Sequence, residues 1–148
     1  MGFAEIDGLQ IHYRTVRDLS APHGYGILYV HGTGCDGRVW QRHMKAIADS
    51  HTPVSIDLPG HGLSSGDGFR GVADHTHYTI QLADHLGWDR FVIAGHSLGG
   101  GIALASAIYC SERLAGMMLI NTGARLRVDP NVLENARQLA AGEAGIPL

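Results

Sequence analysis

The chain has 148 residues, which is enough for one domain and too few for two. Hydrophobic residues make up 45 %, which excludes a disordered chain, and the net charge of −3 leaves no basic field for nucleic acid or an anionic membrane. Glycine is in excess, with 21 residues, roughly twice its usual share.

The predicted elements begin with two short strands on either side of Asp7-Gly8, a pair typical of a tight hairpin. Strand-like and helix-like runs then alternate along the chain. In order, they are a strand at 25–30, a glycine-rich turn at 31–37, a helix at 39–49, a strand at 52–57, a helix at 72–86, a strand at 91–94, a helix at 98–109, a strand at 114–120 and a helix from about 130 to 141. On the helix at 39–49, the expected apolar side carries Val39, Trp40, His43, Met44 and Ile47.

This alternation predicts an α/β fold, with a mostly parallel sheet and helices on both faces. No internal repeat, low-complexity segment or linker interrupts the pattern.

A first glycine motif, Gly32-Thr33-Gly34-Cys35-Asp36-Gly37, matches G-x-G-x-x-G between a predicted strand and a predicted helix. Asp57 closes the next strand, where an acid of a dinucleotide-binding domain would hold a ribose hydroxyl. The motif therefore permits a dinucleotide-binding domain. The alternative is a glycine-rich turn without a nucleotide.

A second motif, Gly95-His96-Ser97-Leu98-Gly99, matches the G-x-S-x-G nucleophile elbow, again between a strand and a helix. Such a turn presents Ser97 in a strained backbone conformation, and the flanking positions must be glycine because side chains there would collide. The peptide N–H of Leu98 would then face the oxygen of a reacting carbonyl group.

The chain resembles the α/β-hydrolase family in three places: His31-Gly32, the loop Asp57-Leu58-Pro59-Gly60-His61-Gly62, and the elbow followed by Gly100. The resemblance covers nearly the whole chain and implies an α/β-hydrolase fold cut off after about the sixth strand. It implies that Ser97 is the nucleophile and that the N–H groups of Thr33 and Leu98 form the oxyanion hole. Supporting positions of the elbow and loop are His31, Gly32, Gly95, His96 and Gly99.

By this resemblance, a complete protein would hydrolyse carboxylic esters or related acyl compounds through an acyl-serine intermediate, as a carboxylesterase-like enzyme of class EC 3.1. No metal or organic cofactor is implied. Serine at position 97 argues against epoxide hydrolases and haloalkane dehalogenases, which resemble this fold but use aspartate there. Lactonase, thioesterase, C–C hydrolase and acyltransferase activities stay open, as does a non-catalytic or slowly reacting ligand receptor on the same fold.

The chain has no histidine after His96, although the family places its catalytic acid and histidine after the nucleophile. We therefore expect residues 1–123 to form the N-terminal part of the core domain and residues 124–148 to begin a cap or lid. The apolar run at 114–120 is typical of a strand inside a sheet, not at its edge. These features predict an inactive 148-residue chain that needs a C-terminal half, from the same gene or a second chain, besides its small acyl substrate.

The other histidines and the cysteines carry weaker signals. His75, His77 and His85 lack a fourth ligand for a metal site and are expected on a solvated helix face. His31 and His61 are expected to hydrogen-bond backbone, and Cys35 to be a small buried residue. No partner is indicated for His12, His23, His43 or His51. With Cys110 as the second of two cysteines, and no visible signal peptide or membrane span, a cytoplasmic location is expected.

Overall fold

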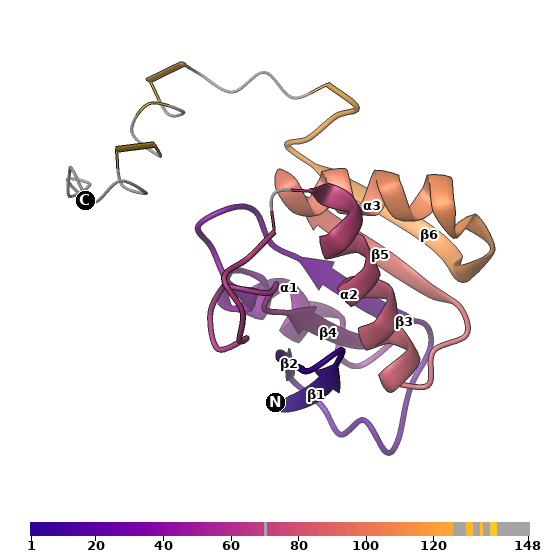
Figure 1. The fold of residues 1–148 in the computed structure, drawn as a ribbon. Coiled ribbons are helices and arrows are strands. Elements are labelled where there is room, and N and C mark those ends of the chain that lie inside the picture. Colours follow the sequence, from indigo (N-terminus) through magenta and orange to yellow (C-terminus); the bar gives the residue numbers. More distant parts are fainter. Residues whose placement is uncertain (70, 126–129, 132–133, 135–136, 139–148) are drawn as a thin grey trace.

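The computed structural model describes residues 1–69, 71–125, 130–131, 134 and 137–138, and its core is a six-stranded sheet flanked by helices (Figure 1). The elements, in chain order, are β1 (Gly2–Ile6), β2 (Leu9–Thr15), β3 (Gly26–Val30), the 3₁₀ turn η1 (Gly37–Trp40), α1 (Gln41–Ile47), β4 (Thr52–Ile56), α2 (Val72–His85), β5 (Phe91–His96), α3 (Leu98–Tyr109), the 3₁₀ turn η2 (Ser111–Arg113) and β6 (Leu114–Ile120).

The strands follow the order β1-β2-β4-β3-β5-β6. The hairpin of β1 and β2 joins the sheet antiparallel to β4, and the remaining neighbours are parallel. Asp7 and Gly8 have φ angles of 48° and 79°, as a two-residue hairpin turn that follows the strand twist requires. The predicted mostly parallel α/β fold is confirmed.

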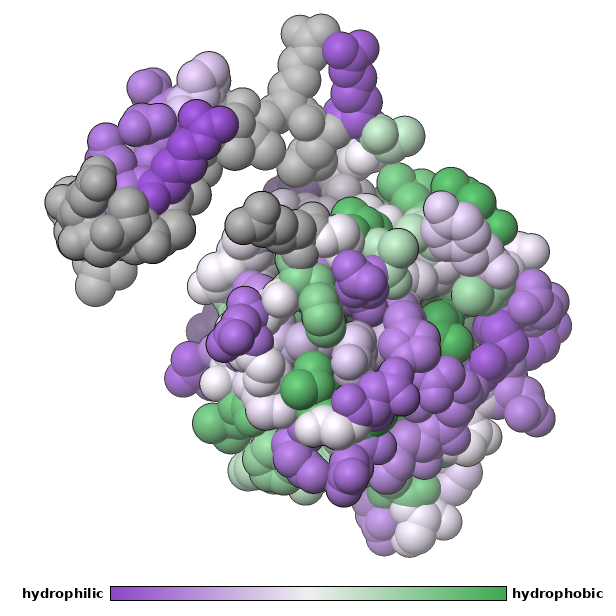
Figure 2. Space-filling view, viewed as in Figure 1, coloured by the Kyte–Doolittle hydropathy of each residue, from purple (hydrophilic) through white to green (hydrophobic). Residues whose placement is uncertain are grey.

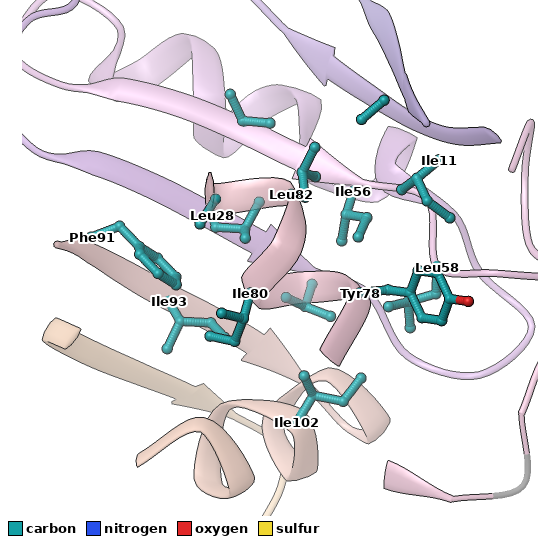
Figure 3. Close-up of a cluster of buried hydrophobic side chains, with 14 of the residues drawn as sticks. Ile11, Leu28, Ile56, Leu58, Tyr78, Ile80, Leu82, Phe91, Ile93 and Ile102 are labelled. Carbon is teal, nitrogen blue, oxygen red and sulfur yellow. The ribbon is translucent and has the colours of Figure 1, made fainter. Parts of the chain in front are cut away.

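Helices cover both faces of the sheet, with α2 and α3 on one and α1 on the other (Figure 1). The larger core lies between the sheet and α2 and α3, where Leu28, Ile56, Phe91 and Ile93 of the strands meet Leu82 and other helix residues (Figure 3). A smaller core on the other face holds Ile27, Tyr29, Trp40, Met44 and Ala94. Because its side chains enter both cores, β3 is buried along its whole length, as its apolar run predicts.

The helix predicted at 39–49 differs at its start. A 3₁₀ turn precedes the α-helix, and the Asp36 carboxylate caps it by accepting a hydrogen bond of 2.8 Å from the Arg38 N–H. Trp40 and Met44 are buried as expected, but Val39 and His43 are exposed. The tighter turn changes which side chains share a face, so the α-helical pattern fails at these two positions.

Strand β6 forms one edge of the sheet, and its last four residues are exposed although all are apolar. Ile108 and Tyr109, at the end of α3, are also exposed. Figure 2 shows hydrophobic residues gathered on the part of the molecule formed by α3 and β6. We refer to β6 and these two residues as the β6 edge.

The predicted cap region at 124–148 and the helix from about 130 to 141 lie almost wholly outside the described residues. Among the helices that the structure does describe, none is both long and apolar enough to cross a lipid bilayer.

Candidate active site

Ser97 sits at the junction of β5 and α3 in a strained conformation, with φ 52° and ψ −113°. The two glycines of the motif make this turn possible. A Cβ atom at Gly95 would lie 2.1 Å from the carbonyl oxygen of Gly99, and one at Gly99 would lie 2.2 Å from the carbonyl oxygen of Val30. Neither position can hold a side chain, because the colliding atoms belong to the backbone.

The backbone of Ser97 is held while its side chain is free. The Ser97 N–H donates to the carbonyl oxygen of Ile120 (3.2 Å), and the Ser97 carbonyl oxygen accepts from the Thr122 hydroxyl (2.9 Å) and from the Gly100 N–H (3.0 Å). The Oγ atom makes no hydrogen bond within the described part of the chain, and the residue is half-buried. The strained turn is thus fixed by the end of β6 and by the segment after it.

One peptide N–H beside Ser97 comes from Leu98, the first residue of α3. An N–H in the first turn of a helix has no intrahelical acceptor, and the helix dipole makes this end favourable for negative charge. Leu98 therefore offers a donor next to the serine, and no described residue accepts a hydrogen bond from it.

A second N–H comes from Thr33, in the loop after β3. The carbonyl oxygen of Gly32 accepts hydrogen bonds from the His31 Nδ1–H (2.8 Å) and the Cys35 N–H (3.2 Å). Since the C=O and N–H of a trans peptide point in opposite directions, these bonds also set the direction of the Thr33 N–H. A Cβ atom at Gly32 would lie 3.2 Å from the Cβ of Ser97, so the loop passes directly beside the elbow.

The buried ring of His31 uses both nitrogens. Because Nδ1 donates to the carbonyl oxygen of Gly32, Nε2 is left to accept a hydrogen bond from the Leu58 N–H (3.0 Å). Burial lowers the pKa of His31, which favours the neutral ring that this arrangement needs. His31 thereby joins the loop after β3 to the loop after β4.

Asp57 joins the same two loops to β2. Its buried carboxylate accepts hydrogen bonds from the Gly37 N–H (2.7 Å), the Leu63 N–H (3.0 Å), His12 Nδ1 (2.9 Å) and the Arg14 guanidinium (3.3 Å). Burial alone would raise the pKa of Asp57, but these partners lower it. With its acceptors occupied, Asp57 cannot hold a ribose, and the dinucleotide interpretation of Gly32–Gly37 is wrong.

Within the described residues, no imidazole is hydrogen-bonded to the Ser97 hydroxyl. His96 packs against the loop after β3, since a Cβ atom at Gly32 would lie 3.0 Å from its Nδ1. His61 Nδ1–H donates to the carbonyl oxygen of Pro59 (3.1 Å). These histidines support loops, and none of their contacts within the described residues reaches the serine hydroxyl.

The expectation of a solvated helix face is wrong for His75, which is 2 % exposed, whereas His77 is exposed and contacts the Asp7 carboxylate (2.7 Å). The spacing of His75 to Thr79 and Leu82, both buried on the same side of α2, would have placed it in the core. Cys35, expected to be buried, is only half-buried.

Two cavities flank the elbow. One, of about 520 Å³, is lined by Thr33, His61, Asp67, Gly68, Phe69, His75 and Leu98. The other, of about 240 Å³, is lined by Cys35, Val39, Trp40, His43, His96 and Ile120. The larger one contains both residues that supply free N–H groups, and we call it the donor cleft.

The sequence profile of the alpha/beta hydrolase family matches residues 27–147, so the chain belongs to this family. It is 32 % identical over 123 residues to the dihydrolipoyllysine-residue acetyltransferase component of an acetoin cleaving system from Cupriavidus necator, covering 80 % of this chain and 31 % of that protein. It is 33 % identical over 102 residues to haloalkane dehalogenase 2 of Mycobacterium tuberculosis, covering 67 % of this chain and 35 % of that protein.

Among solved structures, the enol-lactonase from Burkholderia xenovorans superimposes with a TM-score of 0.83 at 25 % identity, covering 95 % of this chain and 54 % of the lactonase. The chain thus spans about half the length of this enzyme and about a third of the two relatives above.

Proposed function

We propose that this chain supplies the nucleophile and the oxyanion hole of a serine hydrolase that cleaves carboxylic esters or related acyl compounds. The observation that carries the proposal is the strained Ser97 between two unoccupied peptide N–H donors, those of Thr33 and Leu98. A hydroxyl flanked by such donors suits attack on a carbonyl group.

In the proposed reaction, Ser97 Oγ attacks the carbonyl carbon and its proton passes to a base. The carbonyl oxygen becomes negative and is stabilised by the two N–H groups. When the tetrahedral intermediate collapses, the bond to the leaving oxygen breaks and the base returns the proton to that oxygen. Water then hydrolyses the acyl-serine by the same steps.

Serine at the elbow favours acyl chemistry over the carbon–halogen cleavage named for one relative, since dehalogenases of this fold use aspartate at the position of Ser97. The enol-lactonase with the similar fold acts, by its name, on a cyclic ester.

We further propose that the base and its orienting acid come from a complementary polypeptide segment. The described residues hold no imidazole on Ser97, and no histidine follows His96. The apolar β6 edge offers a place for such a segment to join the sheet. Removing the base of a well-studied serine protease lowers kcat about 2 × 10⁶-fold, so the chain alone should have negligible esterase turnover.

A fluorophosphonate probe, which labels reactive serines, tests the proposal, with imidazole in solution as a substitute base. We expect slow labelling of the 148-residue chain, faster labelling as imidazole is added, and none in Ser97→Ala. Ser111→Ala, which removes an exposed serine far from the elbow, is the matched control and should label like the unaltered chain.

Labelling at a residue other than Ser97, or no labelling with imidazole, would overturn the nucleophile assignment. Rapid labelling or ester turnover without imidazole would show instead that a group within the chain acts as the base.

A ligand receptor on the same fold is the second candidate. The observation that favours it is the free Ser97 Oγ, which has no base among the described residues. Tight binding of an acyl compound without covalent labelling under any of these conditions would support this candidate.

We also propose a cytoplasmic location, supported by the two thiols of Cys35 and Cys110, which are both free.

A further inference from the structure

The donor cleft is lined by two kinds of polar group. Thr33 and Leu98 carry peptide N–H groups that have no acceptor among the described residues. His61, Asp67 and His75 contribute polar side chains. The hydrogen-bonding roles of these three side chains follow from the bonds that they already make.

His61 offers an acceptor. Its Nδ1 contacts the carbonyl oxygen of Pro59, which can only accept, so Nδ1 carries the hydrogen and Nε2 of the neutral ring has a free lone pair. Nε2 has no partner within the described residues, and the side chain is half-buried. Asp67 adds an exposed carboxylate without an ion-pair partner in the described part of the chain.

His75 is a second acceptor. Nε2 donates to the carbonyl oxygen of Phe69 (3.2 Å), and Nδ1 is buried without a partner among the described residues. Burial lowers the pKa of His75, so its ring is neutral and Nδ1 holds a lone pair. The rings of His61 and His75 are 6.4 Å apart, and Phe69 lies 5.5 Å from His75. The part of the cleft lined by His61, Phe69 and His75 therefore presents aromatic ring edges and imidazole acceptors. We call it the histidine wall.

We propose that the donor cleft binds a neutral acyl compound that also carries a hydroxyl or amide N–H group. Its carbonyl oxygen lies at Thr33 and Leu98, and its own donor lies on His61 Nε2 and the Asp67 carboxylate. This inference rests on the proposed hydrolase function and names the class of substrate for that site.

The histidine wall disfavours a ligand that carries a carboxylate in place of the hydroxyl or amide group. A carboxylate only accepts hydrogen bonds, so beside His61 and His75 it would face the imidazole lone pairs and the negative charge of Asp67. The ring-opened acid formed from a hydroxylated lactone should therefore bind more weakly than the lactone.

The test compares two ligands that differ by one hydroxyl group, γ-butyrolactone and α-hydroxy-γ-butyrolactone. The full 148-residue chain with Ser97→Ala, which prevents turnover, is titrated with each while NMR follows the imidazole of His61 and the amides of Thr33 and Leu98. We expect the hydroxylated lactone to bind about 5-fold more tightly, which corresponds to ~1 kcal/mol, the net value of one hydrogen bond.

His61→Phe keeps a ring of similar size and removes the Nε2 acceptor, so it should reduce the ratio of the two affinities. His43→Phe, on the other cavity beside the elbow, is the matched control and should keep the preference. Should His61→Phe fail to fold, Asp67→Asn at an exposed position serves instead, and it should strengthen binding of the ring-opened acid because it removes a negative charge.

Equal affinities for the two lactones, no shifts with either, or a preference of unchanged size in His61→Phe would overturn the inference. The fluorophosphonate test of the proposed hydrolase function can succeed or fail independently of this binding test. Labelling of Ser97 without a hydroxyl preference would leave a hydrolase of another substrate class. A hydroxyl preference without labelling would leave a ligand site without hydrolysis.

Discussion

At the scale of single residues, the glycines near Ser97 differ in what an added side chain would meet. At Gly95 it would collide with the backbone of Gly99, whereas at Gly101 the nearest atom is a methyl group of Val72 at 3.9 Å. Gly95 is required because no side chain fits at its position. Gly101 lies inside α3, where glycine only weakens the helix.

We therefore expect opposite effects from the same substitution at these two positions. Gly95→Ala should lower the free energy of unfolding by about 1–3 kcal/mol, the usual cost of overpacking. Gly101→Ala should raise it by roughly 0.5–1 kcal/mol, because alanine favours a helix. Urea unfolding monitored by circular dichroism measures both. Equal stability of Gly95→Ala and the unaltered chain would contradict the steric account of the elbow.

His31 gives a pH prediction at the same scale. Burial lowers the pKa of His31 and His75 below the ordinary value of 6.5, so below this pH the unfolded chain binds more protons than the folded chain. Their contribution to stability is fully present above 6.5 and is lost as the pH falls. Protonation would also place two donors, Nε2–H and the Leu58 N–H, against each other.

Urea midpoints between pH 7.5 and 5.5 should therefore fall with pH, and His31→Gln should show a smaller fall because one of the two histidines is gone. His23→Gln, at an exposed position, is the control and should follow the unaltered chain. An unchanged pH dependence in His31→Gln would contradict the assignment.

At the scale of elements, β6 is the part of the sheet that fits its environment least. Edge strands are usually short, charged or covered, but β6 has seven residues, none of them charged. Within the described residues β6 pairs with β5 alone, so its backbone groups on the other side and its apolar side chains can pair with another strand.

The isolated chain should consequently self-associate through β6. Met118→Lys combined with Leu119→Lys places a charge on each face of the strand. In sedimentation velocity over a series of rising concentrations, we expect the double variant to stay monomeric while the unaltered chain associates. Val39→Lys, at another exposed apolar position, is the control and should leave association unchanged. If the double variant associates as strongly as the unaltered chain, another surface is responsible.

At the scale of the whole molecule, the features encoded by short segments could be predicted. The bounds of α3 and β6 agree with the expected 98–109 and 114–120, because runs of small or apolar residues end there at polar and turn-forming ones. The hairpin follows from Asp7 and Gly8, residue types that tolerate positive φ angles, and the strained turn at Ser97 follows from the glycines at positions 95 and 99.

The parts that could not be predicted depend on residues far apart in the chain. The buried carboxylate of Asp57 is held by His12, 45 positions earlier, and no local pattern signals that pair. The composition of the donor cleft likewise appears only once the loop carrying Asp67 and Phe69 lies beside α2 and α3. The sequence therefore predicted the strained turn at Ser97, but not the composition of the cleft beside it.

The two edge strands of the sheet differ in length and charge, and this difference limits the size of the oligomers that edge pairing can form. The opposite edge, β1, has only five residues and carries the charged, exposed Glu5, both of which discourage pairing. Two copies that join through β6 use the same surface on each, an arrangement with twofold symmetry that leaves no free apolar edge. We therefore expect any association through β6 to stop at a closed dimer and not to continue into fibres.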